Sequence, residues 1–257
     1  MELETFNLFL VAMAFIAVIV FIALYFVDAG YGMFFNKKWG PSLPNRWGWL
    51  LMEAPVFAAM CLLWYYSGCE RRNDVVRLCF LSLFLLHYFQ RSFVFPFLMK
   101  GGNRTPLVII LMAITFNMAN AAMQGGWIFY FSRVDNYPLS WFYSWQFILG
   151  VVLFFAGVYV NIDSDRIIRN LRKPGDKAHY LPRGGMFKYV SSANYFGELI
   201  EWIGFAILTW SWAGALFAVW TFANLAPRAA RIYKRYEAEF GEEFIKEKRK
   251  RIIPFIY

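Results

Sequence analysis

Polar and ionisable side chains stand inside long apolar stretches of this chain, and their types and spacing define the candidates for chemistry. Glu53 follows Leu-Leu-Met early in one stretch, and Tyr88 lies in the middle of another, within His-Tyr-Phe-Gln-Arg. Ionisable groups are expensive in lipid, so inside a membrane segment they indicate a functional site. Glu53 is either a water-exposed carboxylate near a membrane surface or an acid held within a bundle. Tyr88 and Arg91 are three residues apart and share a helical face, and we expect His87 to be structural.

A second polar group lies at the end of a later apolar stretch. Asn161, Asp165 and Arg172 are spaced at i, i+4 and i+11, and Arg169 fits the same helical stripe. A solvated, salt-bridged helix end would explain these charges. The stripe can also bind a polar ligand, because amides and carboxylates bind hydroxyl groups and guanidinium groups bind phosphate.

A third polar group opens a further apolar stretch. Asn194, Glu198 and Glu201 are spaced at i, i+4 and i+7, so we expect them to face the bundle interior or an aqueous cavity. A basic helix is predicted near the C-terminus, carrying Arg228, Arg231, Arg235 and Tyr236. The polar groups together suit a phosphorylated, polyhydroxylated ligand such as a nucleotide. The remainder, rich in Phe and Trp, suits an apolar substrate.

The elements that position these groups are predicted to be membrane helices. The chain is 60% hydrophobic and only 17% charged, more apolar than a typical soluble domain. Seven stretches approach the roughly 20 residues that a membrane helix needs, and they lack the alternation of a β-barrel. We therefore predict one domain, 1–257: an all-α integral membrane protein with seven transmembrane helices in a single bundle. The helices are predicted near 7–27, 47–67, 77–98, 106–131, 139–161, 192–209 and 211–227, with a loop at 162–191 and a basic segment at 228–257.

The basic residues predict the orientation of this bundle. Most of the 26 Lys and Arg residues lie in alternate loops and in the C-terminal segment, which share one side of a seven-helix bundle. Cytoplasmic loops carry an excess of Lys and Arg. The N-terminus is therefore predicted outside and the C-terminus in the cytosol, with the polar ligand bound from the cytosolic side.

Several other functions are disfavoured by composition. The net charge of +9 flanks apolar stretches and accompanies no nucleic-acid motif, so it indicates topology rather than nucleic-acid binding. Three cysteines and two histidines supply a metal site poorly, and we expect no metal. The Gly184-Gly185 pair predicts a sharp turn, but it is not the G-x-G-x-x-G fingerprint of a Rossmann fold.

Short motifs along most of the chain carry a family resemblance. The N-terminal half contains Gly30-Tyr31-Gly32, Glu53-Ala54-Pro55 and His87-Tyr88-Phe89. The C-terminal half contains Asn-Ile-Asp-Ser-Asp at 161–165, Leu-Arg-Lys-Pro-Gly at 171–175, Pro-Arg-Gly-Gly-Met-Phe-Lys-Tyr-Val-Ser at 182–191, Ala-Asn-Tyr-Phe-Gly-Glu-Leu-Ile-Glu-Trp at 193–202 and Ile-Pro-Phe-Ile-Tyr at 253–257. Together these motifs resemble the steroid 5-alpha-reductase, or 3-oxo-5-alpha-steroid 4-dehydrogenase, family.

The resemblance implies an NADPH-dependent membrane oxidoreductase that reduces the C4–C5 double bond of 3-oxo-Δ4 steroids. It implies seven membrane helices, a cytosolic cofactor site and a steroid or steroid-like lipid as substrate. No obligate protein partner is evident from the sequence. Glu53 and Tyr88 would lie at the carbonyl oxygen of the substrate. The implied cofactor-binding residues are Tyr31, Arg91, Arg104, Asn161, Asp165, Arg172, Tyr180, Asn194, Glu198, Arg228 and Tyr236.

Two departures and three alternatives accompany this resemblance. Met52 and Ile232 stand where animal members often have glutamine and histidine, which indicates altered ligand contacts. Related membrane families include enoyl-thioester reductases of fatty-acid elongation and isoprenylcysteine methyltransferases. A transporter or lipid-binding protein without chemistry would use intramembrane charges as a translocation path, although the chain shows none of the inverted repeats common in transporters.

Overall fold

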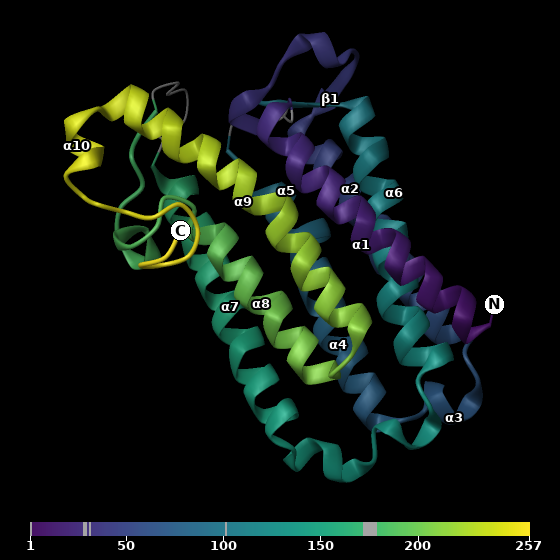
Figure 1. Ribbon diagram of the computed structural model, residues 1–257. Coiled ribbons are helices and arrows are strands. Elements are labelled where there is room, and N and C mark those ends of the chain that lie inside the picture. Colours follow the sequence, from purple (N-terminus) through teal and green to yellow (C-terminus); the bar gives the residue numbers. More distant parts are fainter. Residues whose placement is uncertain (1, 28–29, 31, 101, 172–178) are drawn as a thin grey trace.

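The computed structural model describes residues 2–27, 30, 32–100, 102–171 and 179–257, and these are mostly helical (Figure 1). Short 3-10 and π-helical turns extend or precede several of the helices. The α-helices are α1 (Leu3–Phe26), α2 (Asn45–Tyr65), α3 (Cys69–Arg72), α4 (Val75–Phe89), α5 (Phe95–Leu98), α6 (Leu107–Gly126), α7 (Trp145–Asn170), α8 (Ala193–Thr209), α9 (Trp212–Phe240) and α10 (Glu242–Ile245).

Five helical segments in the described part of the chain are long and apolar enough to cross a membrane. They are Leu3–Phe26, Asn45–Tyr65, Val75–Leu98, Leu107–Phe131 and Trp145–Asn170, and they correspond to the first five predicted spans. The chain is therefore a helical, multi-pass membrane protein. The last two predicted spans, 192–209 and 211–227, are helices α8 and α9, but neither meets the same criteria of length and hydropathy. Seven crossings and the orientation of the bundle stay predictions.

Both ends of the fifth span differ from the sequence prediction. The fifth span was expected at 139–161, but a 3-10 turn occupies Leu139–Tyr143 and the α-helix runs to Asn170. The reason is Ser144, whose hydroxyl accepts a hydrogen bond from the Phe147 amide and caps a new helix there. Helix α9 continues beyond 227 as a basic helix, as expected, and ends at Phe240.

A small sheet was also missed by the all-α prediction. Strands β1 (Ser42–Pro44) and β2 (Arg104–Pro106) pair antiparallel, with Leu43 opposite Thr105. Each strand is three residues long and ends in a proline that begins a helix, so no alternation of side chains could reveal it. The pairing connects the N-terminus of α2 to the N-terminus of α6.

A π-helical turn interrupts the third span where candidate residues lie. Residues Gln90–Val94 form this turn between α4 and α5, and the Phe95 amide bonds the Gln90 carbonyl five residues back. Pro96 lacks an amide hydrogen and cannot bond the carbonyl of Ser92, which loosens the helix at this point. Such turns are frequent at functional sites because they reorient the side chains beside them.

Helices α7 and α8 pack with their backbones in close approach, and they run side by side in Figure 1. A Cβ atom added at Gly157 would lie 2.3 Å from the amide nitrogen of Glu201, and one added at Gly197 would lie 2.5 Å from that of Asn161. Small residues allow this approach, which is a common way for membrane helices to associate. This contact places the polar residues from Asn161 onward on α7 beside those from Asn194 onward on α8.

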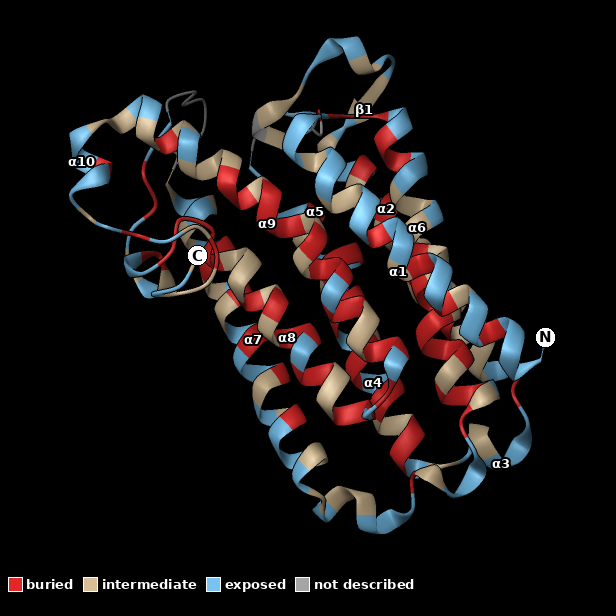
Figure 2. Cartoon of the chain, viewed as in Figure 1, coloured by how far each residue is buried: buried red, intermediate tan, exposed pale blue. Residues whose placement is uncertain are grey.

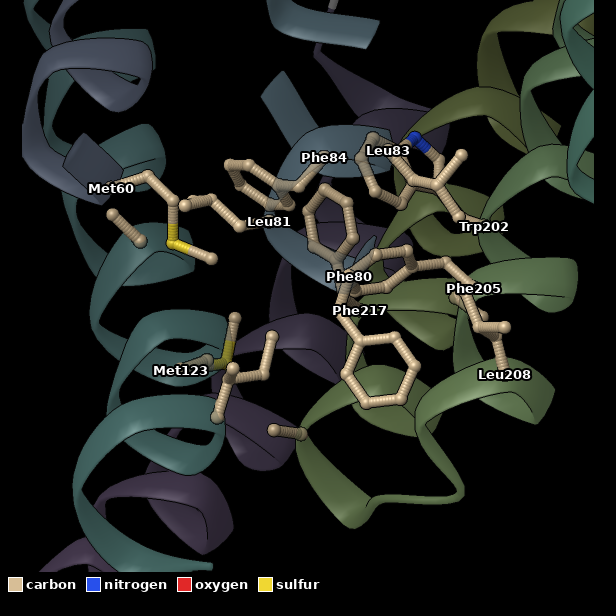
Figure 3. Packing of buried hydrophobic residues seen from close by; sticks show 14 of the residues in the cluster. Met60, Phe80, Leu81, Leu83, Phe84, Met123, Trp202, Phe205, Leu208 and Phe217 are labelled. Atoms are coloured by element: carbon tan, nitrogen blue, oxygen red, sulfur yellow. The ribbon is translucent and has the colours of Figure 1, made fainter. Parts of the chain in front are cut away.

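The main core is rich in aromatic residues and draws on α1, α2, α4, α6, α8 and α9; Figure 3 shows part of it. Trp202 is almost fully buried in it, with its ring 4.6 Å from that of Phe217 and 5.9 Å from that of Phe84. Burial is concentrated on the inward faces of the helices, and the outer faces of α1 and α7 are largely exposed (Figure 2). Those exposed faces are apolar, with Phe15 and Tyr159 among them, as expected where lipid covers a helix.

The end of α6 is fixed by a buried arginine. Arg77, near the start of α4, is fully buried and donates to the backbone carbonyls of Ile128, Arg133 and Val134. It also bonds Asp74 at 2.8 Å and the Ser132 hydroxyl at 3.1 Å. These bonds satisfy its charge and hold the π-helical turn Trp127–Phe131 at the end of α6.

Candidate active site

A cavity of about 670 Å³ opens between the ends of α2, α5, α7, α8 and α9. Its volume falls within the range of small-molecule and cofactor sites. Its walls combine aromatic rings with cationic side chains, the latter being Arg46, Lys100, Arg104, Arg169 and Arg228. A cavity with this lining suits a ligand that carries both phosphate groups and planar rings.

Asp165 joins three elements at the inner wall of this cavity. It is buried on α7 and accepts a hydrogen bond of 3.2 Å from the side-chain amide of Asn194 on α8. It also accepts one of 3.2 Å from Arg91, in the π-helical turn. The guanidinium of Arg91 lies 4.6 Å from the ring of Trp49 and 4.5 Å from that of Phe95, both of which line the cavity. The predicted cofactor residues Arg91, Asp165 and Asn194 are thus in direct contact.

Two other predicted cofactor residues lie behind this wall. The side-chain amide of Asn161 donates to the backbone carbonyl of Asn194 at 2.9 Å, so it fixes the start of α8. Glu198 is half-buried, one helical turn beyond Asn194, and within electrostatic range of Arg91 and Asp165. Neither Asn161 nor Glu198 lines the cavity.

The remaining predicted residues fall into two sets. Arg104, Tyr180, Arg228 and Tyr236 all line the cavity. Arg104 bonds the Ser42 hydroxyl at 2.9 Å and the Ser42 carbonyl, which ties it to β1, and Arg228 lies over the ring of Tyr195 at 5.6 Å. Tyr31 and Arg172 lie outside the described residues.

Ser192 was not singled out from the sequence. It precedes α8, is 1% exposed and lines the cavity, and its hydroxyl has no hydrogen-bond partner in the described part of the chain. A buried hydroxyl normally has a partner, so an orphan at a cavity wall indicates a ligand or a water there. The signal was weak because a serine next to another serine, just before a helix, is common and carries no charge.

The outer edge of the cavity carries one carboxylate with a perturbed pKa. Burial by itself would raise the pKa of Glu239, but hydrogen bonds with Arg235 at 2.8 Å and His179 at 3.0 Å outweigh it. The pKa of Glu239 therefore lies below its ordinary value, and the carboxylate stays charged. It partly balances the cationic lining at the entrance.

Glu53 and Tyr88 do not line this cavity, and both contact α6. Tyr88 is 3% exposed, packs on Phe84 with a ring separation of 4.7 Å, and accepts a hydrogen bond of 2.9 Å from Asn120. Glu53 is half-buried on α2 and accepts one of 3.2 Å from Asn117. Asn117 and Asn120 are one helical turn apart, so the acid and the phenol lie beside neighbouring positions of one helix.

A buried pair stands behind Tyr88. His87 bonds Glu201 at 2.7 Å, and the His87 ring lies 4.6 Å from that of Trp202. Glu201 is 1% exposed and faces the interior, as predicted for this face of α8. The structural role expected for His87 agrees with this contact, because the pair joins α4 to α8 beside the phenol.

The amides of α6 were missed from the sequence. Asn117, Asn120 and Gln124 are buried and follow one another at i, i+3 and i+7 within the apolar stretch 106–131. The signal was present, since polar residues inside an apolar stretch had identified Glu53 and Tyr88. Neutral amides are cheaper to bury than charges, and these three have no charged residue beside them in the stretch, so their signal is weaker than that of Asn161 and Asn194.

Comparison with known proteins identifies relatives over nearly the whole chain. A steroid 5-alpha-reductase DET2 of Arabidopsis thaliana is 39% identical over 242 residues, which cover 92% of this chain and 90% of that protein. A 3-oxo-5-alpha-steroid 4-dehydrogenase 1 of Bos taurus is 40% identical over 243 residues, covering 94% of this chain and 93% of its own. The human protein of that name is 40% identical over 215 residues, covering 84% and 81%.

The sequence pattern of a whole family also matches. The family described as 3-oxo-5-alpha-steroid 4-dehydrogenase matches residues 103–257, which include the cavity-lining parts of α7, α8 and α9. The match agrees with the resemblance carried by the short motifs, and it covers more than half of the chain. The chain belongs to the 3-oxo-5-alpha-steroid 4-dehydrogenase family.

Proposed function

We propose that this protein uses NADPH to reduce the C4–C5 double bond of 3-oxo-Δ4 steroids. The names of its relatives support the reaction class and the steroid substrate. The observation that carries the proposal is the arrangement of a buried phenol and a carboxyl group, Tyr88 and Glu53, behind a cationic cavity. Arg91 and Asp165 connect the two regions, because Arg91 lies on the helical segment that follows Tyr88.

The cavity residues fit the dinucleotide. Arg104, Arg169 and Arg228 offer guanidinium groups for phosphates, including the 2′-phosphate that distinguishes NADPH from NADH. The orphan hydroxyl of Ser192 offers a hydrogen bond at the wall. Tyr195 and Trp49 offer ring faces, and each already stacks with a guanidinium. Bound NADPH would supply the hydride that adds to the β-carbon of the enone.

Tyr88 and Glu53 would act on the carbonyl oxygen of the substrate. Negative charge develops on this oxygen as the β-carbon is reduced, and a preorganised donor there stabilises the transition state. Tyr88 can donate through its hydroxyl. Glu53 can donate if protonated, or it can orient Tyr88 if ionised. Solvent supplies the proton that completes the α-carbon.

The surrounding side chains keep this site dry and fixed. Phe84 and Trp202 pack against Tyr88, and both belong to the aromatic core. A water-excluded site strengthens hydrogen bonds to developing charge and costs no reorganisation during the reaction. The ion pair of Arg91 with Asp165 would fix the position of the inner cavity wall relative to the Tyr88 hydroxyl.

The test is NADPH oxidation by purified protein in detergent with testosterone, followed by product mass and ring-fusion stereochemistry. We expect a product with two added hydrogens and the 5-alpha configuration. Tyr88→Phe and Glu53→Gln should each lower kcat by about 10² to 10³, typical for loss of a donor to an oxyanion. Tyr65→Phe is the matched control, because Tyr65 is exposed at the end of α2.

The same preparation separates this function from its alternatives. Reduction of linear enoyl thioesters but not of the steroid would contradict the proposed substrate. Recovery of the steroid unchanged, with no NADPH consumed, would contradict reductase chemistry. Tighter binding of S-adenosylmethionine than of NADPH would favour a methyltransferase.

A further inference from the structure

The three buried amides on α6 bond three different helices. Asn117 donates at 2.7 Å to the Met52 carbonyl on α2, Asn120 donates at 2.9 Å to the Tyr88 hydroxyl on α4, and Gln124 donates at 2.9 Å to the Ala213 carbonyl on α9. The bonds to Met52 and Ala213 end on backbone carbonyl groups. Asn117 also donates at 3.2 Å to the Glu53 carboxylate. Asn120 differs from both neighbours because its bond ends on the Tyr88 hydroxyl and not on a backbone carbonyl.

The direction of the Asn120 bond follows from the polar groups around it. Asn120 is 0% exposed, and its Oδ1 atom has no hydrogen-bond partner in the described part of the chain. The reverse orientation of the amide would leave both of its N–H groups without an acceptor. Buried orphan N–H groups are rarer than under-satisfied carbonyl oxygens. The N–H of Asn120 therefore donates, and the Tyr88 oxygen accepts.

This direction fixes the proton of Tyr88. A phenol has one hydrogen to donate, and a bond accepted from Asn120 leaves that hydrogen uncommitted. Among the described residues, no acceptor lies within hydrogen-bond distance of the Tyr88 hydroxyl other than the Asn120 side chain. The ring itself is held by Phe84, His87 and Trp202. The hydroxyl hydrogen is therefore free to meet a ligand oxygen.

We propose that Asn120 is a positioning residue that makes Tyr88 a hydrogen-bond donor toward the carbonyl oxygen of the substrate. Asn120 acts through Tyr88, and this role rests on the proposed reductase function. The bond it donates also withdraws electron density from the phenol oxygen, which strengthens donation by the hydroxyl. Asn117 holds α2 one helical turn away, so that Glu53 lies beside the same part of α6.

The first test is a double-mutant cycle in the reduction assay. Asn120→Leu should lower kcat by about tenfold to a hundredfold, less than loss of a direct donor, with little change in KM for NADPH. In a Tyr88→Phe background the same change should cost less than about threefold, because residues in one hydrogen-bond network are not additive. Equal costs in both backgrounds would overturn the proposal.

Gln124→Leu is the matched control. It removes a buried amide from the same helix that bonds neither Tyr88 nor Glu53. It should lower thermal stability without coupling to Tyr88→Phe. Asn120→Ser serves where Asn120→Leu fails to fold, since the shorter hydroxyl cannot span the distance to Tyr88.

A second measurement does not depend on turnover. The infrared C–O stretching band of Tyr88 can be isolated as the difference between unliganded wild-type and Tyr88→Phe proteins carrying labelled tyrosine. Loss of an accepted hydrogen bond should move this band to higher frequency in Asn120→Leu and leave it unchanged in Gln124→Leu. An unmoved band in Asn120→Leu would overturn the inference even if wild-type protein reduced the steroid. A moved band in protein without reductase activity would support the hydrogen bond and contradict only the proposed function.

Discussion

At the scale of single residues, the site depends on a few buried polar contacts between distant parts of the sequence. His87 bonds Glu201, 114 positions away, and Arg91 bonds Asp165, 74 positions away. The residue types were visible in the sequence, because each is polar within or beside an apolar stretch. The pairings were not, because helical periodicity relates residues within one helix and not between helices.

The contact between Arg91 and Asp165 leads to a prediction about cofactor binding. Asp165→Asn removes the charge that holds Arg91 and leaves a buried cation without its partner, a costly arrangement. We expect the Kd for NADPH to rise by about tenfold or more, where each tenfold change corresponds to about 1.4 kcal/mol. Fluorescence titration of NADPH measures it.

Asp163→Asn is the control for this change. Asp163 lies on the same helix and pairs with the exposed Arg166 at 2.7 Å, away from Arg91. Ion pairs at the surface contribute little, so the Kd of the Asp163→Asn protein for NADPH should stay within about twofold of the wild-type value. Unchanged NADPH affinity in Asp165→Asn would contradict the placement of the cofactor at this wall.

At the scale of helices, apolar runs predicted the first five spans and the helical nature of the last two. Local hydrogen bonding decided what the runs could not reveal. Ser144 caps α7 and so sets where it begins, later than predicted. Pro96 lacks an amide hydrogen, which favours the π-helical turn that contains Arg91. Two three-residue strands that each end in a proline form a small sheet. Each of these features depends on one or two residues. Hydrophobic patterns are read over much longer windows of sequence, so they cannot show such features.

The close packing of α7 on α8 leads to a prediction about stability. Gly157→Ala would place a Cβ atom 2.3 Å from the Glu201 amide nitrogen, so the two backbones must separate. Overpacking of this kind costs about 1–3 kcal/mol. Thermal unfolding in detergent should show the loss, and NADPH binding should weaken because Asp165 and Asn194 move apart.

Gly68→Ala is the control, because nothing lies within 4 Å of the added Cβ atom. Gly68 precedes α3, and its φ of −57° suits alanine. It should leave stability within about 0.5 kcal/mol of wild type. A Gly157→Ala protein as stable as wild type would show that α7 and α8 are less closely packed than described.

At the scale of the whole molecule, the distribution of basic residues predicts which face meets the cytosol. The cationic cavity is lined in part by the C-terminal half of α9, which carries several basic residues. Cytosolic NADPH could reach it directly only if that side faces the cytosol. The proposed use of cytosolic NADPH therefore depends on the predicted orientation of the bundle.

Cysteine labelling in intact cells tests the orientation. Cys69 is exposed in α3 between the second and third predicted spans, on the side predicted to face out. In a protein whose other cysteines are alanine, an impermeant maleimide should label Cys69 from outside. A cysteine placed instead by Lys250→Cys, beside the C-terminus, should react only after permeabilisation. The reverse pattern would invert the bundle and remove cytosolic access to the cavity.

Isotope transfer tests most sharply whether the protein reduces the β-carbon of a steroid enone with NADPH. The test uses NADPH that carries deuterium at both C4 positions of the nicotinamide ring, with testosterone and purified protein, and locates deuterium in the product. Hydride transfer to the β-carbon should leave one deuterium at C5, in the 5-alpha configuration, and a solvent hydrogen at C4. Deuterium at C3, or a product without deuterium despite NADPH oxidation, would contradict it.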